Sequence, residues 1–391
     1  MIQRALDLSR LLGRSRSAFL FGPRGVGKTL LAQAWLEGLG DGLHIDLLHS
    51  EVYRSYLSEP ERLRYEVERS LGRKTLTVVV DEVQRLPVLL DEVHGLLERY
   101  KRRVRFLLTG SSARKLKRGG ANLLAGRAWT LRLHPLSSSE IDVDLRRALR
   151  YGTLPAIYLE DDAPRRSLQA YVDSYLREEV LAESLVRKTE GFVRFLDAAG
   201  QRNGEPVNHS KLGRAAGVSS KTIEQYFSIL VDTLVAVRID GWSRSVRRQL
   251  RQAPKYYFFD CGVVNALAGE LRTPLRRGTY RYGKLFETFV VNEVVRLNDD
   301  RDLGYRLYYW RTNTGLEVDL VLARAASEPP CAIELKSDVG PESSELRGLK
   351  AFAADNPTAE LLCLCQTPRA YRRDGVDVLP WRDGLDRLAA R

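Results

Sequence analysis

The sequence predicts a multidomain α/β protein whose first domain is a parallel sheet with a phosphate-binding loop. The first observation is an apolar strand, Ala18–Phe21, that runs into a glycine-rich loop and then into an apolar helix start. The second is a β-branched run, Leu76–Val80, typical of a strand buried on both faces of a parallel sheet. The third is length, because 391 residues exceed one core and indicate two or three domains.

The α/β pattern extends over the first part of the chain. Short apolar runs alternate there with helical patterns, as in a three-layer α/β domain. The expected strands are Ala18–Phe21, Leu43–Asp46, Leu76–Val80, Val104–Thr109 and Trp129–Leu133.

The loop after the first strand has the Walker A spacing, G-x-x-x-x-G-K-T. We expect it to hold ATP through Gly22, Pro23, Arg24, Gly25, Val26, Gly27, Lys28 and Thr29. Its glycines let backbone N–H groups point at phosphate, and the following helix adds its positive end. Lys28 is expected to reach the β- and γ-phosphates, and the Thr29 hydroxyl to bind Mg²⁺. A chance glycine-rich turn would lack this context of strand, Lys-Thr and helix.

Polar residues at or near the ends of further expected strands are the next candidates. Asp81 is predicted to bind Mg²⁺ and Glu82 to orient the attacking water, the alternative being an acidic pair that merely caps a buried strand. Thr109 is the candidate γ-phosphate sensor, although a simple turn explains the pattern equally well. Arg127 is the candidate arginine finger, one of many arginines in a basic chain.

The composition is that of a globular chain with a basic balance. The net charge of +12 favours polyanionic partners, with a compositional bias toward arginine as the alternative. The four cysteines are scattered and are expected to be buried thiols. No apolar run is long enough to span a membrane, and the mixed charges of Met1–Gly13 argue against a signal peptide. We therefore expect a cytoplasmic protein with no membrane partner.

The middle of the chain becomes helical and then carries a helix-turn-helix pattern. A short helix, a Gly turn and a Ser cap before a second helix lie within residues 212–230, and residues 234–238 and 256–259 can pair as a wing. DNA contact and a role as lid or spacer are equally expected of this unit. The arginines expected near the wing tip are Arg244, Arg247, Arg248 and Arg251.

The last third holds a second set of chemically suggestive residues. Period two places Glu334 and Lys336 on one face of an apolar strand, and Asp319 is an acid within another. With Glu287 from an upstream helix, they predict a carboxylate cluster for Mg²⁺ or Mn²⁺, held by Asp319 and Glu334, with Lys336 to polarise water or stabilise a phosphorane. Each acid taken alone is more often a surface residue on an amphipathic strand.

These motifs together resemble the prokaryotic AAA-type P-loop ATPases that carry a winged-helix region and a C-terminal domain of unknown function with a restriction-endonuclease-like, PD-(D/E)xK core. The resemblance covers nearly the whole chain and is most specific in Val80–Gln84, Val318-Asp319 and Glu334–Lys336. It implies that Asp319 and Glu334 hold metal, that Lys336 serves catalysis and that Glu287 completes the site. The chain departs from better-known relatives at Thr109, where Asn is common, and at Leu176–Glu179, where the basic-acidic pair is blurred.

The expected domains are a P-loop AAA-like ATPase domain (residues 1–163), a helical and winged-helix region (164–254) and a restriction-endonuclease-like α/β domain (255–391). The first functional hypothesis is an ATP-binding and hydrolysing protein that binds nucleic acid, DNA before RNA, and cuts it in an ATP-gated, metal-dependent reaction at the C-terminal domain. The alternative is an ATP-driven switch that binds DNA or a protein through an inactive nuclease-like scaffold. A sequence-independent helicase is a weaker third option, and homo-oligomerisation is compatible with each.

Overall fold

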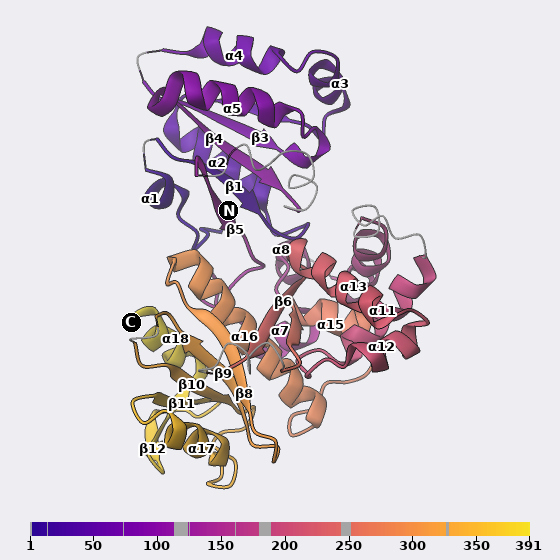
Figure 1. The fold of residues 1–391 in the computed structure, drawn as a ribbon, viewed down its shortest axis with the longest axis vertical. Helices are drawn as coiled ribbons and strands as arrows, with labels where there is room; N and C mark the ends of the chain where they lie inside the picture. The colour runs from indigo at the N-terminus through magenta and orange to yellow at the C-terminus, as the bar shows by residue number, and fades with distance from the viewer. Residues whose placement is uncertain are drawn as a thin grey trace. The chain divides into compact units, whose positions relative to one another are not determined.

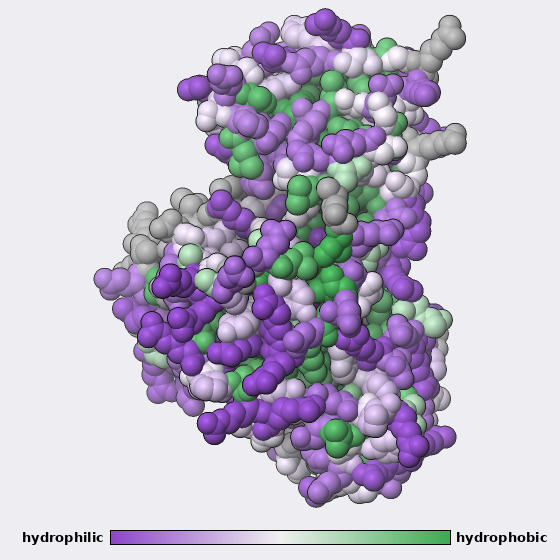
Figure 2. Space-filling model, turned by 180° about the vertical axis from the view of Figure 1, so that it is seen from behind, coloured by the Kyte–Doolittle hydropathy of each residue, from purple (hydrophilic) through white to green (hydrophobic). Residues whose placement is uncertain are grey.

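The computed structural model describes residues 2–13, 15–72, 74–112, 124, 126–160, 162–179, 189–243, 252–325 and 328–391 (Figure 1). The described chain forms two compact units, divided between Leu136 and Ser137, with Asp232–Val235 belonging to the first unit. Within these residues, no helix combines the length and apolar character that crossing a bilayer requires. Hydrophilic residues predominate on the face drawn in Figure 2, and apolar residues gather there in smaller areas.

The first unit is built on a five-stranded sheet in which every neighbouring pair is parallel. Its strands in the order β2-β3-β4-β1-β5 are Leu43–Asp46, Leu76–Asp81, Val104–Gly110, Ser17–Phe21 and Ala128–Arg132. The predicted α/β fold class is confirmed, and the strands lie where the apolar runs placed them. Because β4 separates β1 from β3, the end of β4 lies between the ends of the two strands that carry the phosphate-binding loop and the acidic pair.

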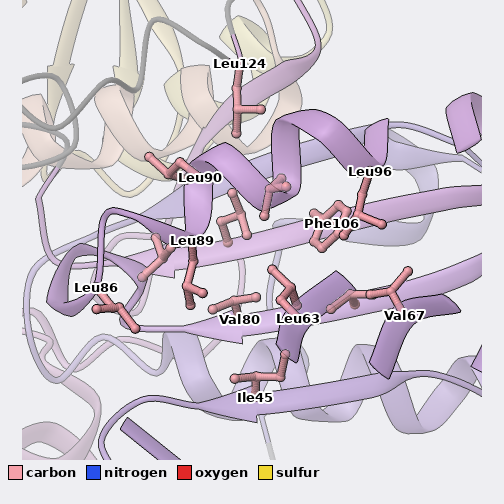
Figure 3. Close-up of a cluster of buried hydrophobic side chains, with 14 of the residues drawn as sticks. Ile45, Leu63, Val67, Val80, Leu86, Leu89, Leu90, Leu96, Phe106 and Leu124 are labelled. Carbon is pink, nitrogen blue, oxygen red and sulfur yellow. The ribbon is translucent and has the colours of Figure 1, made fainter. Parts of the chain in front are cut away.

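The helices of the first unit bury one apolar stripe each. They are α1 (Leu8–Leu12), α2 (Lys28–Leu39), α3 (Ser50–Ser58), α4 (Arg62–Ser70) and α5 (Leu89–Tyr100), with short 3₁₀ turns at Val83–Arg85 and Lys101–Arg103. Leu63 and Val67, four residues apart on α4, and Leu89 and Leu96 on α5 belong to one buried apolar cluster with Phe106 of β4 (Figure 3). Each such side chain contributes about 1.5–3 kcal/mol on burial. This core supports the ends of β3 and β4.

The second unit begins with helices and ends with a large mixed sheet. Its helices before the first strand of the sheet are α7 (Leu145–Tyr151), α8 (Pro155–Leu159), α9 (Pro164–Ala170), the π-helical segment Tyr171–Glu179, α11 (Thr189–Gln201), α12 (His209–Ala216) and α13 (Ser220–Asp232), and α15 (Cys261–Leu267) follows the second strand. Helices α12 and α13 form where the helix-turn-helix pattern expects them, and Gly217 between them has φ of 70°, which favours glycine. The assignment of this region to the winged-helix class stays a prediction.

The sheet of the second unit has eight strands in the order β12-β13-β11-β10-β9-β8-β6-β7. They are Tyr371–Arg373, Val376–Pro380, Glu360–Cys365, Cys331–Leu335, Glu317–Ala323, Arg306–Arg311, Ala236–Gly241 and Lys255–Phe258, accompanied by α16 (Tyr280–Arg301), α17 (Arg347–Asp355) and α18 (Trp381–Ala389). The two strands expected as a wing do pair antiparallel, but β6 also pairs parallel with β8. One sheet therefore joins strands from both sides of the expected boundary at residues 254 and 255, and the three-domain division stays a prediction.

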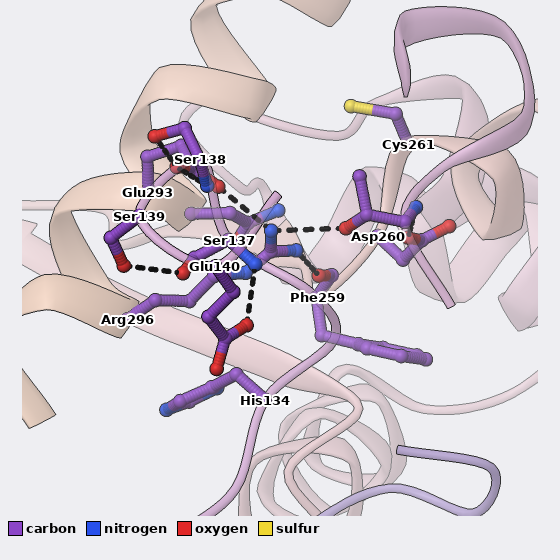
Figure 4. A network of polar contacts seen from close by, with 12 residues as sticks. His134, Ser137, Ser138, Ser139, Glu140, Phe259, Asp260, Cys261, Glu293 and Arg296 are labelled. Atoms are coloured by element: carbon purple, nitrogen blue, oxygen red, sulfur yellow. Dashed lines mark hydrogen bonds and ion pairs between the residues drawn. The ribbon is translucent and has the colours of Figure 1, made fainter. Parts of the chain in front are cut away.

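A buried polar network fixes the start of the second unit to α15 and α16 (Figure 4). Arg296 donates to Glu293 Oε1 at 2.9 Å and to Thr153 Oγ1 at 3.0 Å, and Glu293 Oε2 accepts the N–H of Ser138 at 2.8 Å. Asp260 accepts the Thr153 N–H at 2.7 Å and also caps α15. Because this buried ion pair and the carboxylate beside it are hydrogen-bonded, the network holds its geometry without exposing charge to the core.

Candidate functional sites

The phosphate-binding loop depends on its glycines in this structure. Gly25 and Gly27 have φ of 82° and 93°, a region that side chains rarely adopt. A Cβ on Gly22 would collide with the backbone carbonyl of Leu133. Since Gly27 immediately precedes α2, the loop ends at a helix N-terminus, as the Walker pattern requires.

Lys28 lies under this loop rather than in solvent. Lys28 is only 6% exposed, and its Nζ donates to the carbonyl oxygens of Gly22 at 2.9 Å and Pro23 at 3.1 Å. These are hydrogen bonds that an ammonium can exchange for phosphate oxygens when nucleotide enters the loop. Arg4 supports the loop from the N-terminal segment by donating to the Val26 carbonyl at 2.7 Å. No local pattern distinguishes Arg4 from the many other arginines of the chain.

Hydroxyl groups surround the carboxylate at the end of β3. Thr29 Oγ1 donates to Asp81 Oδ2 at 2.5 Å, and Thr109 Oγ1 donates to Asp81 Oδ1. The structure thus brings together the three residues that were predicted to hold Mg²⁺ or sense phosphate. A carboxylate and a threonine hydroxyl are hard oxygen donors of the kind Mg²⁺ prefers, so the donor set fits this ion.

Glu82 occupies an unusual backbone conformation beside this carboxylate. Its φ of 56° lies in the left-handed region, which is uncommon for residues other than glycine and recurs at functional sites. Its N–H donates to Thr109 Oγ1 at 3.1 Å, and its carboxylate accepts a hydrogen bond from Gln84 Nε2. Gln84 Nε2 also donates to Ser111 Oγ at 3.2 Å, so Gln84 connects the ends of β3 and β4. Sequence reasoning assigned Gln84 no role.

Arg127 lies against α5 in this structure. Its Nε donates to Glu98 Oε1 at 2.6 Å, and both side chains are exposed. Arg127 lowers the pKa of the Glu98 carboxyl through that hydrogen bond and its charge. A role for Arg127 as an arginine finger stays a prediction and would require this exposed pair to open.

The second predicted site lies in the second unit, on neighbouring strands. The register of β9 and β10 pairs Leu320 with Ile333, which brings Asp319 and Glu334 to adjacent positions. Asp319 Oδ2 accepts the N–H of Leu335 at 2.8 Å. Burial, and after it the charge of Glu287, raises the pKa of Asp319 to about 6. Burial and the nearby Asp319 likewise raise the pKa of Glu334 well above its usual range.

Lys336 completes this pair at the end of β10. Its Nζ lies 3.0 Å from Glu334 Oε1 and 3.6 Å from Glu345 Oε1. The other oxygen of Glu334, Oε2, is buried without a hydrogen-bond partner. A buried carboxylate oxygen without a donor is costly, and it is open to a cation or a proton.

Glu287 faces the same region but is engaged by cations that sequence reasoning missed. Tyr257 donates to its Oε1 at 2.7 Å, Lys284 Nζ lies 2.9 Å from its Oε2, and Lys255 Nζ lies 3.8 Å from its Oε1. Burial opposes ionisation, but Lys255 and Lys284 outweigh it and lower the pKa of Glu287. Lys255 is only 1% exposed and also pairs with Glu317. The lysine at the start of the apolar strand K-Y-Y-F was the sequence feature that could have indicated this buried cation.

These contacts decide how the second site fits a metal ion. Among the described residues, no group of three or more His, Cys, Asp or Glu side chains is arranged to hold one. Asp319 and Glu334 still offer two adjacent carboxylates, one with an unpartnered oxygen. Mg²⁺ is commonly bound through one or two carboxylates together with water and substrate phosphate, so this pair fits such an ion without Glu287.

Helix α13 has a polar face. Lys221, Glu224, Gln225 and Ser228 of α13 are exposed, whereas its buried side packs into the second unit. The arginines Arg244, Arg247, Arg248 and Arg251 lie outside the described residues. Contact of α13 with nucleic acid stays a prediction.

Comparison with known proteins agrees with the phosphate-binding loop described in the first unit. Residues 14–142 match the family model of an AAA domain, which supports an AAA-type P-loop ATPase. Residues 142–273 and 282–383 match two domains of unknown function, DUF8612 and DUF4143.

Three curated relatives extend along the chain. It is 27% identical over 363 residues to the uncharacterized protein Rv2008c of Mycobacterium tuberculosis, covering 91% of this chain and 78% of the relative. The same figures hold for the uncharacterized protein Mb2031c of Mycobacterium bovis. An uncharacterized protein of Haemophilus influenzae is 23% identical over 217 residues, covering 51% of this chain and 52% of the relative.

Proposed function

We propose that this chain binds and hydrolyses ATP in its first unit. The observation that carries the proposal is the contact of Thr29 and Thr109 with the Asp81 carboxylate. Thr29 and Asp81 would hold Mg²⁺, which would supply positive charge to offset the charge that develops on the phosphates. Lys28 would exchange its carbonyl partners for the β- and γ-phosphates, and Glu82 would accept a hydrogen bond from the attacking water to orient it toward the γ-phosphorus. Water then forms the new P–O bond as the bond to the β-phosphate oxygen breaks.

Two substitutions test the roles of these residues. Lys28→Ala should weaken binding of a fluorescent ATP analogue and abolish phosphate release, whereas Glu82→Gln should retain binding and slow release. Lys74→Ala, which changes an exposed lysine of the same unit, serves as the control. Phosphate release by Lys28→Ala at the parental rate would contradict the assignment of the loop.

A second activity is supported by the acidic pair of the second unit. We infer that Asp319, Glu334 and Lys336 form a metal-dependent phosphodiesterase centre, gated by ATP. The observation in favour is the unpartnered Glu334 Oε2 beside Asp319. Mg²⁺ or Mn²⁺ there would act as a Lewis acid on a phosphate oxygen. Lys336, whose Nζ lies 3.0 Å from Glu334 Oε1, would stabilise negative charge on the phosphorane.

The alternative is a nucleotide switch with a nuclease-like scaffold that cuts nothing. The engagement of Glu287 by Lys255 and Lys284 favours this alternative, because it removes one of the expected acids from the metal. Cleavage of DNA and RNA panels with Mg²⁺ or Mn²⁺, with and without ATP, separates the two. Activity that disappears in Asp319→Ala and Glu334→Gln but persists in the exposed control Glu328→Gln supports the nuclease. Cleavage that survives Asp319→Ala supports neither this centre nor its mechanism.

A further inference from the structure

An exposed aromatic residue stands among cations at the start of α16. Tyr280 is 74% exposed, more than any other large hydrophobic or aromatic side chain of the described chain. Arg276 and Arg277 precede it and are also exposed. We call these three residues, with Lys284 and Lys336, the Tyr280 patch.

The Tyr280 patch adjoins the acidic pair through two connections. Lys284 lies one helical turn after Tyr280, interacts with it electrostatically and donates to Glu287 Oε2 at 2.9 Å. Arg277 donates to the side chain of Gln366, which in turn donates to the backbone carbonyl of Ser337. Because Ser337 directly follows Lys336, the arginine-bearing loop is fastened beside the strand end that carries the acidic site.

The two lysines of the patch are partly exposed and contact buried carboxylates. The side chains of Lys284 and Lys336 are 30% and 25% exposed, while their ammonium groups contact Glu287 and Glu334. Two acids border the patch: Glu205 Oε1 lies 3.5 Å from the Tyr280 hydroxyl, and Glu345 lies 3.6 Å from Lys336. These contacts orient the ring and the ammonium and leave Arg276 and Arg277 as the outer cations.

We propose that the Tyr280 patch binds a single-stranded segment of nucleic acid, with one base stacked on the Tyr280 ring and adjacent phosphates held by Arg276 and Arg277. An exposed ring offers a stacking surface for a base, and guanidinium groups match phosphate oxygens. A duplex keeps its bases stacked on one another, so only an unpaired strand or frayed end uses the ring. The backbone then continues toward Lys336 and the acidic pair. This inference names the substrate class of the phosphodiesterase centre proposed above and rests on that proposal for its catalytic meaning.

The test compares two fluorescent strands of equal length by anisotropy: oligothymidylate and a strand with abasic sites throughout. Both carry the same phosphates, but only the first offers bases. Tyr280→Ala should weaken oligothymidylate binding roughly 5- to 150-fold, the equivalent of about 1–3 kcal/mol for one stacked base, and should leave abasic binding nearly unchanged. Tyr280→Phe should bind like the parent. Tyr65→Ala, which removes an exposed tyrosine of the first unit, is the matched control.

Each outcome decides the proposal. The proposal is wrong if Tyr280→Ala weakens binding of both strands equally or of neither. It is also wrong if poly-glutamate displaces a bound strand as effectively as oligothymidylate does, because that result indicates an acidic protein partner. Circular dichroism confirms that the variants fold, which is expected for so exposed a side chain. If Tyr280→Ala weakens only oligothymidylate binding but no strand is cut, the strand-binding site stands and the phosphodiesterase proposal fails. If strands are cut equally well by the parent and by Tyr280→Ala, the phosphodiesterase proposal stands and the strand-binding site fails.

Discussion

Substituting Thr109 by Val removes one buried hydroxyl without changing the shape of the side chain. Thr109 is fully buried, and its hydroxyl both donates to Asp81 and accepts the Glu82 N–H at 3.1 Å. Leaving a buried polar group without its partner costs about 1–3 kcal/mol. Two groups lose a partner here, and Glu82 is only half-buried, so we expect a loss of about 2–4 kcal/mol in local stability. Thr109→Ser keeps the hydroxyl and removes one methyl, which should cost about 1 kcal/mol.

Hydrogen–deuterium exchange reports this effect in the first unit alone. Peptides from β3 and β4 should exchange faster in Thr109→Val than in Thr109→Ser, although the Ser variant has the smaller side chain. ATP hydrolysis should fall in the Val variant and stay near the parental rate in the Ser variant, because the hydroxyl at position 109, and not the methyl group, contacts Asp81 and the Glu82 backbone. If the Val variant proves as protected and as active as the Ser variant, these hydrogen bonds do not hold the site.

Two other changes probe the second unit. Asp319→Asn keeps an acceptor for the Leu335 N–H but cannot ionise. Because the pKa of Asp319 is raised to about 6 in the folded state, the parental protein should lose stability as pH rises from about 4 through 6. The variant should lose less stability over that range, as measured by urea unfolding at a series of pH values. Gly152→Ala would place a Cβ against the Asp260 carboxylate at a φ of 74° and should destabilise by about 2–4 kcal/mol through strain and a lost helix cap. Gly38→Ala, in a helix with open space around it, should be neutral or stabilising in the same unfolding assay.

The first unit could be predicted from sequence because its signals are local. A β-branched run such as Leu76–Val80 can be buried on both faces only in a covered parallel sheet, and the loop spacing fixes which strand precedes the helix. The left-handed conformation of Glu82 and its link to Gln84 could not be predicted. They depend on how the ends of β3 and β4 pack, which no local pattern encodes.

The second unit shows a sharper division between local and distant information. Period two correctly placed Glu334 and Lys336 on one side, where their charged groups lie 3.0 Å apart. The pairing of Glu287 with Lys255 and Lys284 escaped prediction, although Lys284 is only three residues away. Glu287 was predicted to complete the acidic site from its position in a motif, whereas Lys255 and Tyr257 reach it from β7 and Lys284 from its own helix.

The charges around the acidic pair connect the pH behaviour of this site to its chemistry. Four carboxylates, those of Glu287, Glu317, Asp319 and Glu334, are accompanied by three ammonium groups, those of Lys255, Lys284 and Lys336. Arg311 also pairs with Glu317, and Glu345 with Lys336. Burial and neighbouring carboxylates raise the pKa values of Asp319 and Glu334, so this pair keeps a proton to higher pH than exposed carboxyl groups do.

A divalent cation bound by Asp319 and Glu334 must displace that proton, because metal ligands bind in their deprotonated form. Affinity for Mn²⁺, measured by calorimetry, should therefore increase as pH rises through about 6, the pKa of Asp319, with proton release that depends on the buffer. Glu334→Gln should lose both the affinity and the proton release. Binding that is independent of pH, or unchanged in Glu334→Gln, would place the cation elsewhere and leave the acidic pair as a protonated part of a scaffold.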